Sequence, residues 1–276
     1  MKKDATSFLY KSAVILCFAA MILVNTLANL LPLNGVTTGA AADSYANLFA
    51  PAGYTFAVWG LIYLLLALYV LGFAGAFRGL SPQSEGLAQP RTPVLFSLSC
   101  LCNIAWIFAW HYRQIALSLV CMLLLLVCLA ALLLPLRRAR LTPFGALLFR
   151  LPFEVYFGWI LVATVANVTV LLVSMQWNGL FLPDTVWTAA ALLAGAAVGT
   201  LVTLRFASAA CGLVLLWAYA GILYRHLSPA GFGGRYPAVI VTVCLCLMLF
   251  AAQVLYVLRS AQLRRMHDEP PAGAPL

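Results

Sequence analysis

Charge is what this sequence has least of. Only 8% of its 276 residues are charged, with 16 Lys or Arg against 7 Asp or Glu, while 64% are hydrophobic and the mean hydropathy is +1.01. Soluble domains carry about 25% charged residues, because charge is what covers a surface in water. The shortage excludes an ordinary soluble domain and indicates an all-α, polytopic membrane protein.

The sequence also lacks the arrangements on which common enzyme chemistries depend. It has no phosphate-binding loop, no paired carboxylates and no recognisable nucleophile beside a base. Its eight cysteines all lie in apolar runs, which favours small buried hydrophobes over disulfides or metal ligands. We therefore expect no catalytic residue, no metal site and no required cofactor, and a binding protein more than an enzyme.

Long apolar runs are abundant. Crossing a bilayer takes roughly 20 helical residues, and eight runs are of about that length: 12–31, 53–76, 94–110, 114–135, 146–173, 185–204, 206–225 and 236–258. We expect the first to be a retained helix, because it lacks a clear signal-peptide cleavage site. Between Val186 and Tyr224 the break is predicted at the sequence LRFAS, which would keep Arg205 at the membrane interface.

The basic residues fall mostly on one side of these runs. With the N-terminus inside, three lie outside, Arg113, Arg225 and Arg235, and thirteen inside: Lys2, Lys3, Lys11, Arg78, Arg91, Arg137, Arg138, Arg140, Arg150, Arg205, Arg259, Arg264 and Arg265. This bias predicts that both termini are cytoplasmic. It also accounts for the net charge of +9 with the lipid bilayer as partner and no nucleic acid. Residues 261–276 are expected to form a disordered cytoplasmic tail.

Aromatic and amide side chains recur at helical spacing in several of the runs. The positions that share one helix face are Asn25 and Asn29; Phe56, Trp59 and Tyr63; Asn103, Trp106 and Trp110; and Tyr156, Trp159, Ala163 and Asn167. An unpaired amide in hydrocarbon is costly, so these faces are expected to meet protein or a cavity. Indole and phenol rings would build a pocket for a large, flat, mostly apolar ligand.

A structural interpretation of these faces stays open beside the pocket. Asparagines between membrane helices often serve packing alone. Trp110 and Tyr112 are expected in an aromatic belt at the interface. His111 and His226 are expected to be ordinary residues near the outer surface. Glu154, the one acid inside a run, is expected to pair with Arg150 four residues earlier.

Four stretches resemble the tryptophan-rich sensory protein family (TspO, bacterial relatives of the translocator protein). They are YANLFAP at 45–51, PAGYTFAVWGLIY at 51–63, NIAW at 103–106 and YFGWILVATVAN at 156–167. The spacing between them is similar as well, over about residues 10–180. One departure is Tyr54, which stands where the family usually has Trp.

The resemblance implies a five-helix bundle over residues 1–180, and residues 181–260 would add a three-helix extension. It implies a bacterial inner-membrane protein, with a homodimer as a possible assembly. It also implies a porphyrin or haem-like tetrapyrrole as ligand, bound for sensing, regulation or trafficking. Tyr45 and Asn47 would lie in a lid loop above the pocket.

The ligand-binding residues expected from the faces and the resemblance together are Asn25, Asn29, Trp59, Tyr63, Asn103, Trp106, Tyr156, Trp159, Ala163 and Asn167. A secondary transporter of a small hydrophobic solute and tryptophan-assisted porphyrin degradation are the alternatives.

Overall fold

The computed structural model describes residues 2–31, 33–77, 91–139 and 141–268. Within these ranges every regular element is helical. The long helices are α1 (Lys2–Leu30), α3 (Val58–Ala74), α4 (Arg91–His111), α5 (Ile115–Arg138), α7 (Leu151–Ser174), α8 (Asp184–Phe206), α9 (Ala209–Leu227) and α10 (Pro237–Asp268). Short elements connect them: η1 (Leu33–Gly35), α2 (Thr38–Asp43), η2 (Gly53–Ala57), α6 (Pro143–Phe149) and η4 (Gly179–Phe181).

Eight of the described helices are long and apolar enough to span a membrane, which confirms the predicted polytopic helical bundle. Their positions agree with the eight apolar runs of the sequence. The break predicted at the sequence LRFAS is a tight turn. Helix α8 ends at Phe206, and Ala207 takes a left-handed conformation with φ 46°. Ser208 then caps α9 by accepting a hydrogen bond from the Cys211 amide at 3.1 Å.

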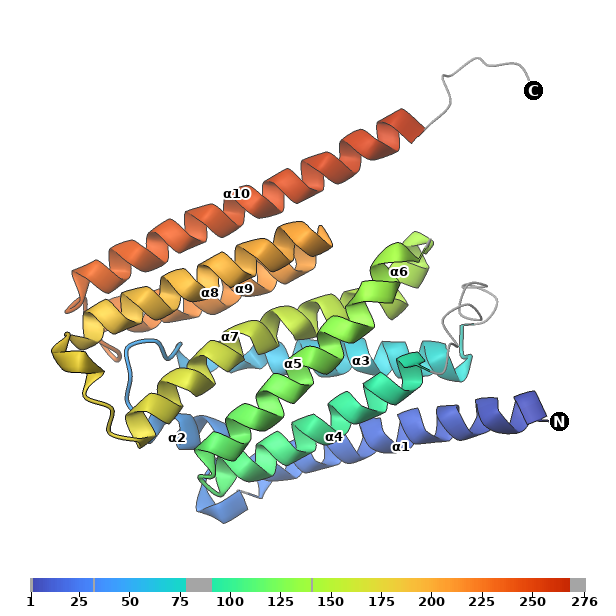
Figure 1. The fold of residues 1–276 in the computed structure, drawn as a ribbon, viewed down its shortest axis with the longest axis horizontal. Helices are drawn as coiled ribbons and strands as arrows, with labels where there is room; N and C mark the ends of the chain where they lie inside the picture. The colour runs from blue at the N-terminus through green and yellow to red at the C-terminus, as the bar shows by residue number, and fades with distance from the viewer. Residues whose placement is uncertain (1, 32, 78–90, 140, 269–276) are drawn as a thin grey trace.

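Helix α7 links two groups of helices. On one side it packs against α3 and α5, and α4 packs in turn against α5 and α1. On the other side it contacts α8 and α9, which are covered by α10 (Figure 1). Its first turns are buried almost all round, from Pro152 to Val162 with only Glu154 partly exposed. A helix that is apolar on every side suits this central position.

Glycines allow the close contacts among the C-terminal helices. A Cβ at Gly158 of α7 would lie 3.2 Å from the Cys211 carbonyl oxygen of α9. One at Gly199 of α8 would lie 2.7 Å from Leu215, and one at Gly195 would lie 2.7 Å from the Tyr219 hydroxyl. Small residues therefore set the helix separations here. Gly195 and Gly199 lie four residues apart on one face of α8, a spacing that favours close helix packing.

Arg150 forms a contact that differs from the expected one. It lies between α6 and α7, and its guanidinium donates to the Leu136 carbonyl at 2.9 Å and the Ala139 carbonyl at 2.9 Å. The last carbonyls of a helix have no partner within that helix, so the end of α5 attracts this cation. The guanidinium thus contacts the end of α5, and no direct ion pair between Arg150 and Glu154 is found among the described contacts.

The predicted tail needs a correction at its start. Helix α10 continues through residues 261–268, which were expected to be disordered, and it ends at Asp268, two residues ahead of the Pro270–Pro271 pair of the sequence. The rest of the tail, the predicted break at 81–86 and the basic residues Arg78 and Arg140 lie outside the described residues.

Two glycine variants test whether close packing holds the C-terminal helices. In Gly212→Ala the new Cβ would meet Val254 at 2.6 Å, whereas at Gly60 of α3 nothing lies within 4 Å. Overpacking costs about 1–3 kcal/mol, so Gly212→Ala is expected to lower the thermal midpoint of the detergent-purified protein by several degrees. Gly60→Ala should leave it unchanged or raise it. Equal midpoints for both variants would contradict this packing.

Candidate functional site

A cavity of about 70 Å³ lies on the α3, α4, α5 and α7 side of the molecule, beneath α2 and the segment that follows it. The segment between α2 and η2, residues 44–52, is called the lid loop below. The residues that line the cavity are Thr38, Ala42, Asn47, Ala50, Pro51, Phe56, Trp59, Trp106, Trp110, Met122, Trp159, Val162, Ala163, Ala166, Asn167 and Val170. Nearly all of this wall is apolar or aromatic.

Four aromatic rings form a continuous stack beside the cavity. Trp59 stacks on Tyr63 at 5.5 Å and on Trp106 at 6.3 Å, and Trp106 stacks on Trp110 at 5.7 Å. Trp159 meets the Trp59 ring edge to face at 6.2 Å. The stack joins α3 to α4, and it explains why each helix carries two aromatic residues four positions apart, Trp59 and Tyr63 on α3 and Trp106 and Trp110 on α4.

The polar atoms of Asn167 are already engaged with protein. Its side-chain oxygen accepts from Trp106 Nε1 at 3.2 Å, and its nitrogen donates to the Ser118 hydroxyl at 3.0 Å. Trp159 differs: its side chain is 3% exposed, and its Nε1 has no hydrogen-bond partner among the described residues. A buried N–H without an acceptor is unfavourable, so this cavity wall holds one donor that protein does not satisfy.

A second polar group lies behind the wall and not on it. Asn25 Nδ2 donates to Asn103 Oδ1 at 2.7 Å, and Asn103 Nδ2 donates to the Tyr156 hydroxyl at 2.9 Å. All three side chains are buried and none lines the cavity. The chain of bonds connects α1, α4 and α7, and this gives Asn103 a role in helix packing. Asn29 is exposed and donates to the Asn25 carbonyl at 3.0 Å.

The ten expected ligand-binding residues therefore fall into two sets. The structure brings Trp59, Trp106, Trp159, Ala163 and Asn167 to the cavity wall. It leaves the others away from that wall, namely Asn25, Asn29, Tyr63, Asn103 and Tyr156.

Sequence reasoning missed several wall residues. Trp110 was assigned to an interfacial belt, but it is 6% exposed and its Nε1 donates to the Thr38 carbonyl at 3.2 Å. Tyr112 is 54% exposed, as a belt residue would be. The i+7 spacing of Trp110 from Asn103 was the available signal. Met122 on α5 and the small residues of α2 had none, because only the tertiary fold brings them to the cavity.

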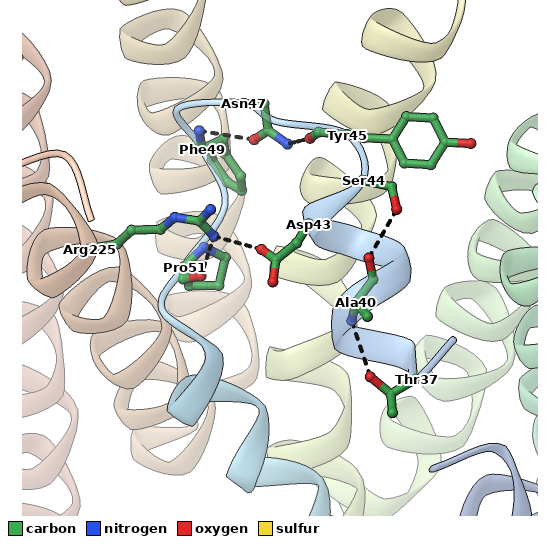
Figure 2. A network of polar contacts seen from close by, with 9 residues as sticks. All are labelled: Thr37, Ala40, Asp43, Ser44, Tyr45, Asn47, Phe49, Pro51 and Arg225. Carbon is green, nitrogen blue, oxygen red and sulfur yellow. Dashed lines mark hydrogen bonds and ion pairs between the residues drawn. The ribbon is translucent and has the colours of Figure 1, made fainter. Parts of the chain in front are cut away.

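The lid loop is held in shape by a local turn (Figure 2). Asn47 Oδ1 accepts from the Phe49 amide at 3.1 Å, and Asn47 Nδ2 donates to the Tyr45 carbonyl at 2.8 Å. This is an Asx-type turn, in which a short amide side chain replaces a backbone partner. Of the two residues expected in the lid, Asn47 lines the cavity, whereas Tyr45 does not.

Both helix-end histidines are buried, so the expectation of ordinary surface residues is wrong for them. His111 is 0% exposed, with Nε2 3.0 Å from the Thr38 hydroxyl and Nδ1 3.2 Å from the Leu33 carbonyl. His226 is 0% exposed as well, and its Nε2 lies 2.8 Å from the Leu48 carbonyl. The connecting segments fold back over the helix ends and enclose the imidazoles, which the local sequence does not reveal.

The family model described as TSPO-like protein matches residues 11–256. The match begins in α1 and ends in α10, so it extends beyond residues 10–180 and includes the three C-terminal helices. No curated protein and no solved structure matches the chain.

The buried amide chain predicts a measurable difference between two asparagines. Asn103→Leu removes two hydrogen bonds and leaves Asn25 and Tyr156 without a side-chain partner. We expect it to destabilise the protein by about 1–2 kcal/mol, since such bonds between membrane helices average roughly 0.6 kcal/mol and unsatisfied groups add to the loss. Asn29→Ala should cost far less, because Asn29 is exposed. Thermal unfolding in one detergent compares them, and equal losses would contradict the packing role of Asn103.

Proposed function

The chain belongs to the TSPO-like protein family, and we propose that it binds a flat, mostly apolar ligand in the aromatic cavity, for sensing, regulation or trafficking. A porphyrin or related tetrapyrrole is the ligand class that the sequence resemblance favours. Trp59, Trp106 and Trp159 supply the flat apolar surface, and Ala163 leaves room between them. Asn167 is the polar group at the wall, although its hydrogen bonds to Trp106 and Ser118 must be kept or exchanged on binding.

The observation that carries the proposal is the unsatisfied Nε1 of Trp159, a residue that lines the apolar cavity although its nitrogen is covered while the cavity is closed. A ligand with a carbonyl, carboxylate or imine nitrogen would accept this hydrogen bond and remove the penalty of burying a free donor. If the Trp159 side chain served helix packing alone, its unpaired N–H would bring no benefit. A hydrogen bond from this N–H to a ligand would give the donor a use, which favours a binding site. It also gives the ligand one fixed point on an otherwise apolar surface.

The size of the cavity adds a condition. Pockets for drug-sized molecules measure roughly 300–1,000 Å³, whereas this cavity encloses about 70 Å³. Binding a tetrapyrrole therefore requires the cavity to widen. Helices α3, α4, α5 and α7 pack through buried side chains, and interiors of that kind resist deformation. The movable wall we propose is the one built by α2 and the lid loop.

We also propose an orientation in the bacterial inner membrane with both termini in the cytoplasm. Eight spans return the chain to the side on which it starts, and the two ends lie at the same end of the bundle (Figure 1). The sequence pattern assigns thirteen of the sixteen basic residues to that side, which supports a cytoplasmic assignment. The lid loop would then face the periplasm.

Titration with protoporphyrin IX, followed by the shift of its Soret absorbance, tests the proposed site. Trp159→Phe keeps a ring but removes the donor, and we expect about tenfold weaker binding from the loss of one hydrogen bond. Ala163→Leu fills the cavity and should abolish saturable binding. Trp177→Phe and Ala190→Leu are the matched controls, because both positions are exposed and neither lines the cavity.

Equal titrations of all four variants would show that the porphyrin only partitions into detergent micelles, and the cavity would then lose its proposed ligand. Light-dependent loss of the porphyrin absorbance that depends on Trp159 would instead favour degradation over binding alone.

A further inference from the structure

Helix α9 contacts the lid loop although no residue of α9 lines the cavity. The side chains of Arg225 and His226 and the backbone of Gly221 make these contacts, and Trp217 contacts η2 directly after the loop. These four residues of α9 are called the clasp below. Positions 217, 221 and 225 follow one another at i+4 spacing, so they share one face of α9. That face is turned to the outer wall of the cavity.

One part of the clasp holds the end of the lid loop near α3 and the η2 turn that follows it. The Ala52 amide donates to the Gly221 carbonyl at 3.1 Å, and Trp217 Nε1 donates to the Thr55 carbonyl at 2.9 Å. A Cβ at Gly221 would overlap the Thr55 side chain, which is 0% exposed. Only glycine allows this approach, so α9 and η2 are fixed against each other here.

The other part of the clasp reaches across the lid loop to α2. Figure 2 shows Arg225 between Asp43 and Pro51: its Nη1 lies 3.3 Å from Asp43 Oδ1 and donates to the Pro51 carbonyl at 3.2 Å. His226 Nε2 lies 2.8 Å from the Leu48 carbonyl, the third contact of α9 with the lid loop itself. Pro51 itself lines the cavity, as does Ala42, the neighbour of Asp43. One guanidinium thus connects both pieces of the movable wall.

The ion pair in this second part is exposed, whereas His226 beside it is buried. The Arg225 side chain is 25% exposed and that of Asp43 is 68% exposed. A polar cleft of about 350 Å³ lies beside them, lined by Tyr224, Ser228 and the glycine-rich turn after α9 among others. An ion pair open to water is weak and breaks readily. The lid loop is therefore anchored at its α3 end and releasable at its α2 end.

We propose that the clasp controls opening of the cavity, with Arg225 as the positioning residue that sets how fast the lid loop moves away. Breaking its contacts with Asp43 and Pro51 would loosen the C-terminal end of α2 and the first part of the lid loop. The start of α2 stays held at Thr38 by Trp110 and His111. His226 still holds Leu48, and Gly221 and Trp217 keep the far end in place. The role of the C-terminal helices is then to hold the lid. The effect on ligand exchange rests on the proposed binding function, whereas the motion itself does not.

Hydrogen–deuterium exchange of the protein in lipid nanodiscs, with no ligand added, measures that motion. The Ala52 amide reports the contact with α9 directly, because its acceptor is the Gly221 carbonyl. In Arg225→Gln we expect peptides covering residues 43–51 to exchange at least about threefold faster, as the loss of a partly exposed ion pair and one hydrogen bond allows. The Ala52 amide should stay protected, because Gly221 keeps that end of the loop in place. Asp43→Asn should have a smaller effect, because the Pro51 contact stays.

Arg235→Gln is the matched control. Arg235 lies on the same side of the molecule, is exposed, and has no side-chain contact with the lid loop among those described. The double variant Arg225→Gln, Asp43→Asn should exchange no faster than Arg225→Gln alone, because both act on one interaction. Unchanged exchange in Arg225→Gln and Asp43→Asn, or equal acceleration by Arg235→Gln, would overturn the clasp.

Stopped-flow mixing with protoporphyrin IX then measures ligand exchange. We expect association and release both to be at least about threefold faster in Arg225→Gln than in wild type, and unchanged in Arg235→Gln. Faster amide exchange with unchanged porphyrin rates would overturn the control of ligand exchange. Faster amide exchange in a protein whose wild type binds no porphyrin would support the motion and overturn the proposed ligand instead.

Discussion

Hydrogen bonds between helices are the interaction on which this structure depends. Inside a bilayer the lipid tails are as apolar as the side chains, so hydrophobic burial does not determine which helices pack against each other. Asn103 makes the packing of α4 specific, because it accepts a hydrogen bond from Asn25 on α1 and donates one to Tyr156 on α7. With three helices held in one arrangement by a single amide, the aromatic residues of α3 and α4 meet as a stack and leave a cavity beside it.

The contacts of α7 and α9 connect the C-terminal helices to that cavity. Gly158 lets α7 approach α9 closely, and Gly221 lets α9 approach η2 just below the lid loop. The approach at Gly221 requires glycine and the one at Gly158 is tight, so the position of α9 relative to the cavity is defined on two sides. The family match over residues 11–256 includes these helices, which agrees with their place in the packing.

Features encoded along a single helix were predictable from the sequence, and features made between distant segments were not. Run length indicated all eight spans, and Arg205 indicated the break between α8 and α9. Periodicity found the faces that carry Trp59, Trp106 and Trp159. It could not separate cavity wall from helix packing, because a buried Asn103 and a lining Asn167 have the same spacing pattern. That difference depends on partners from other helices.

The contacts between α9 and the lid loop go largely to the main chain. Trp217, Arg225 and His226 meet the carbonyls of Thr55, Pro51 and Leu48, and the Ala52 amide meets the Gly221 carbonyl. Main-chain groups are present whatever the side chains are, so the attachment does not depend on lid residues that face the cavity, such as Asn47 and Ala50. Relatives could thus diverge in what the cavity recognises while the loop above it stays held in the same way.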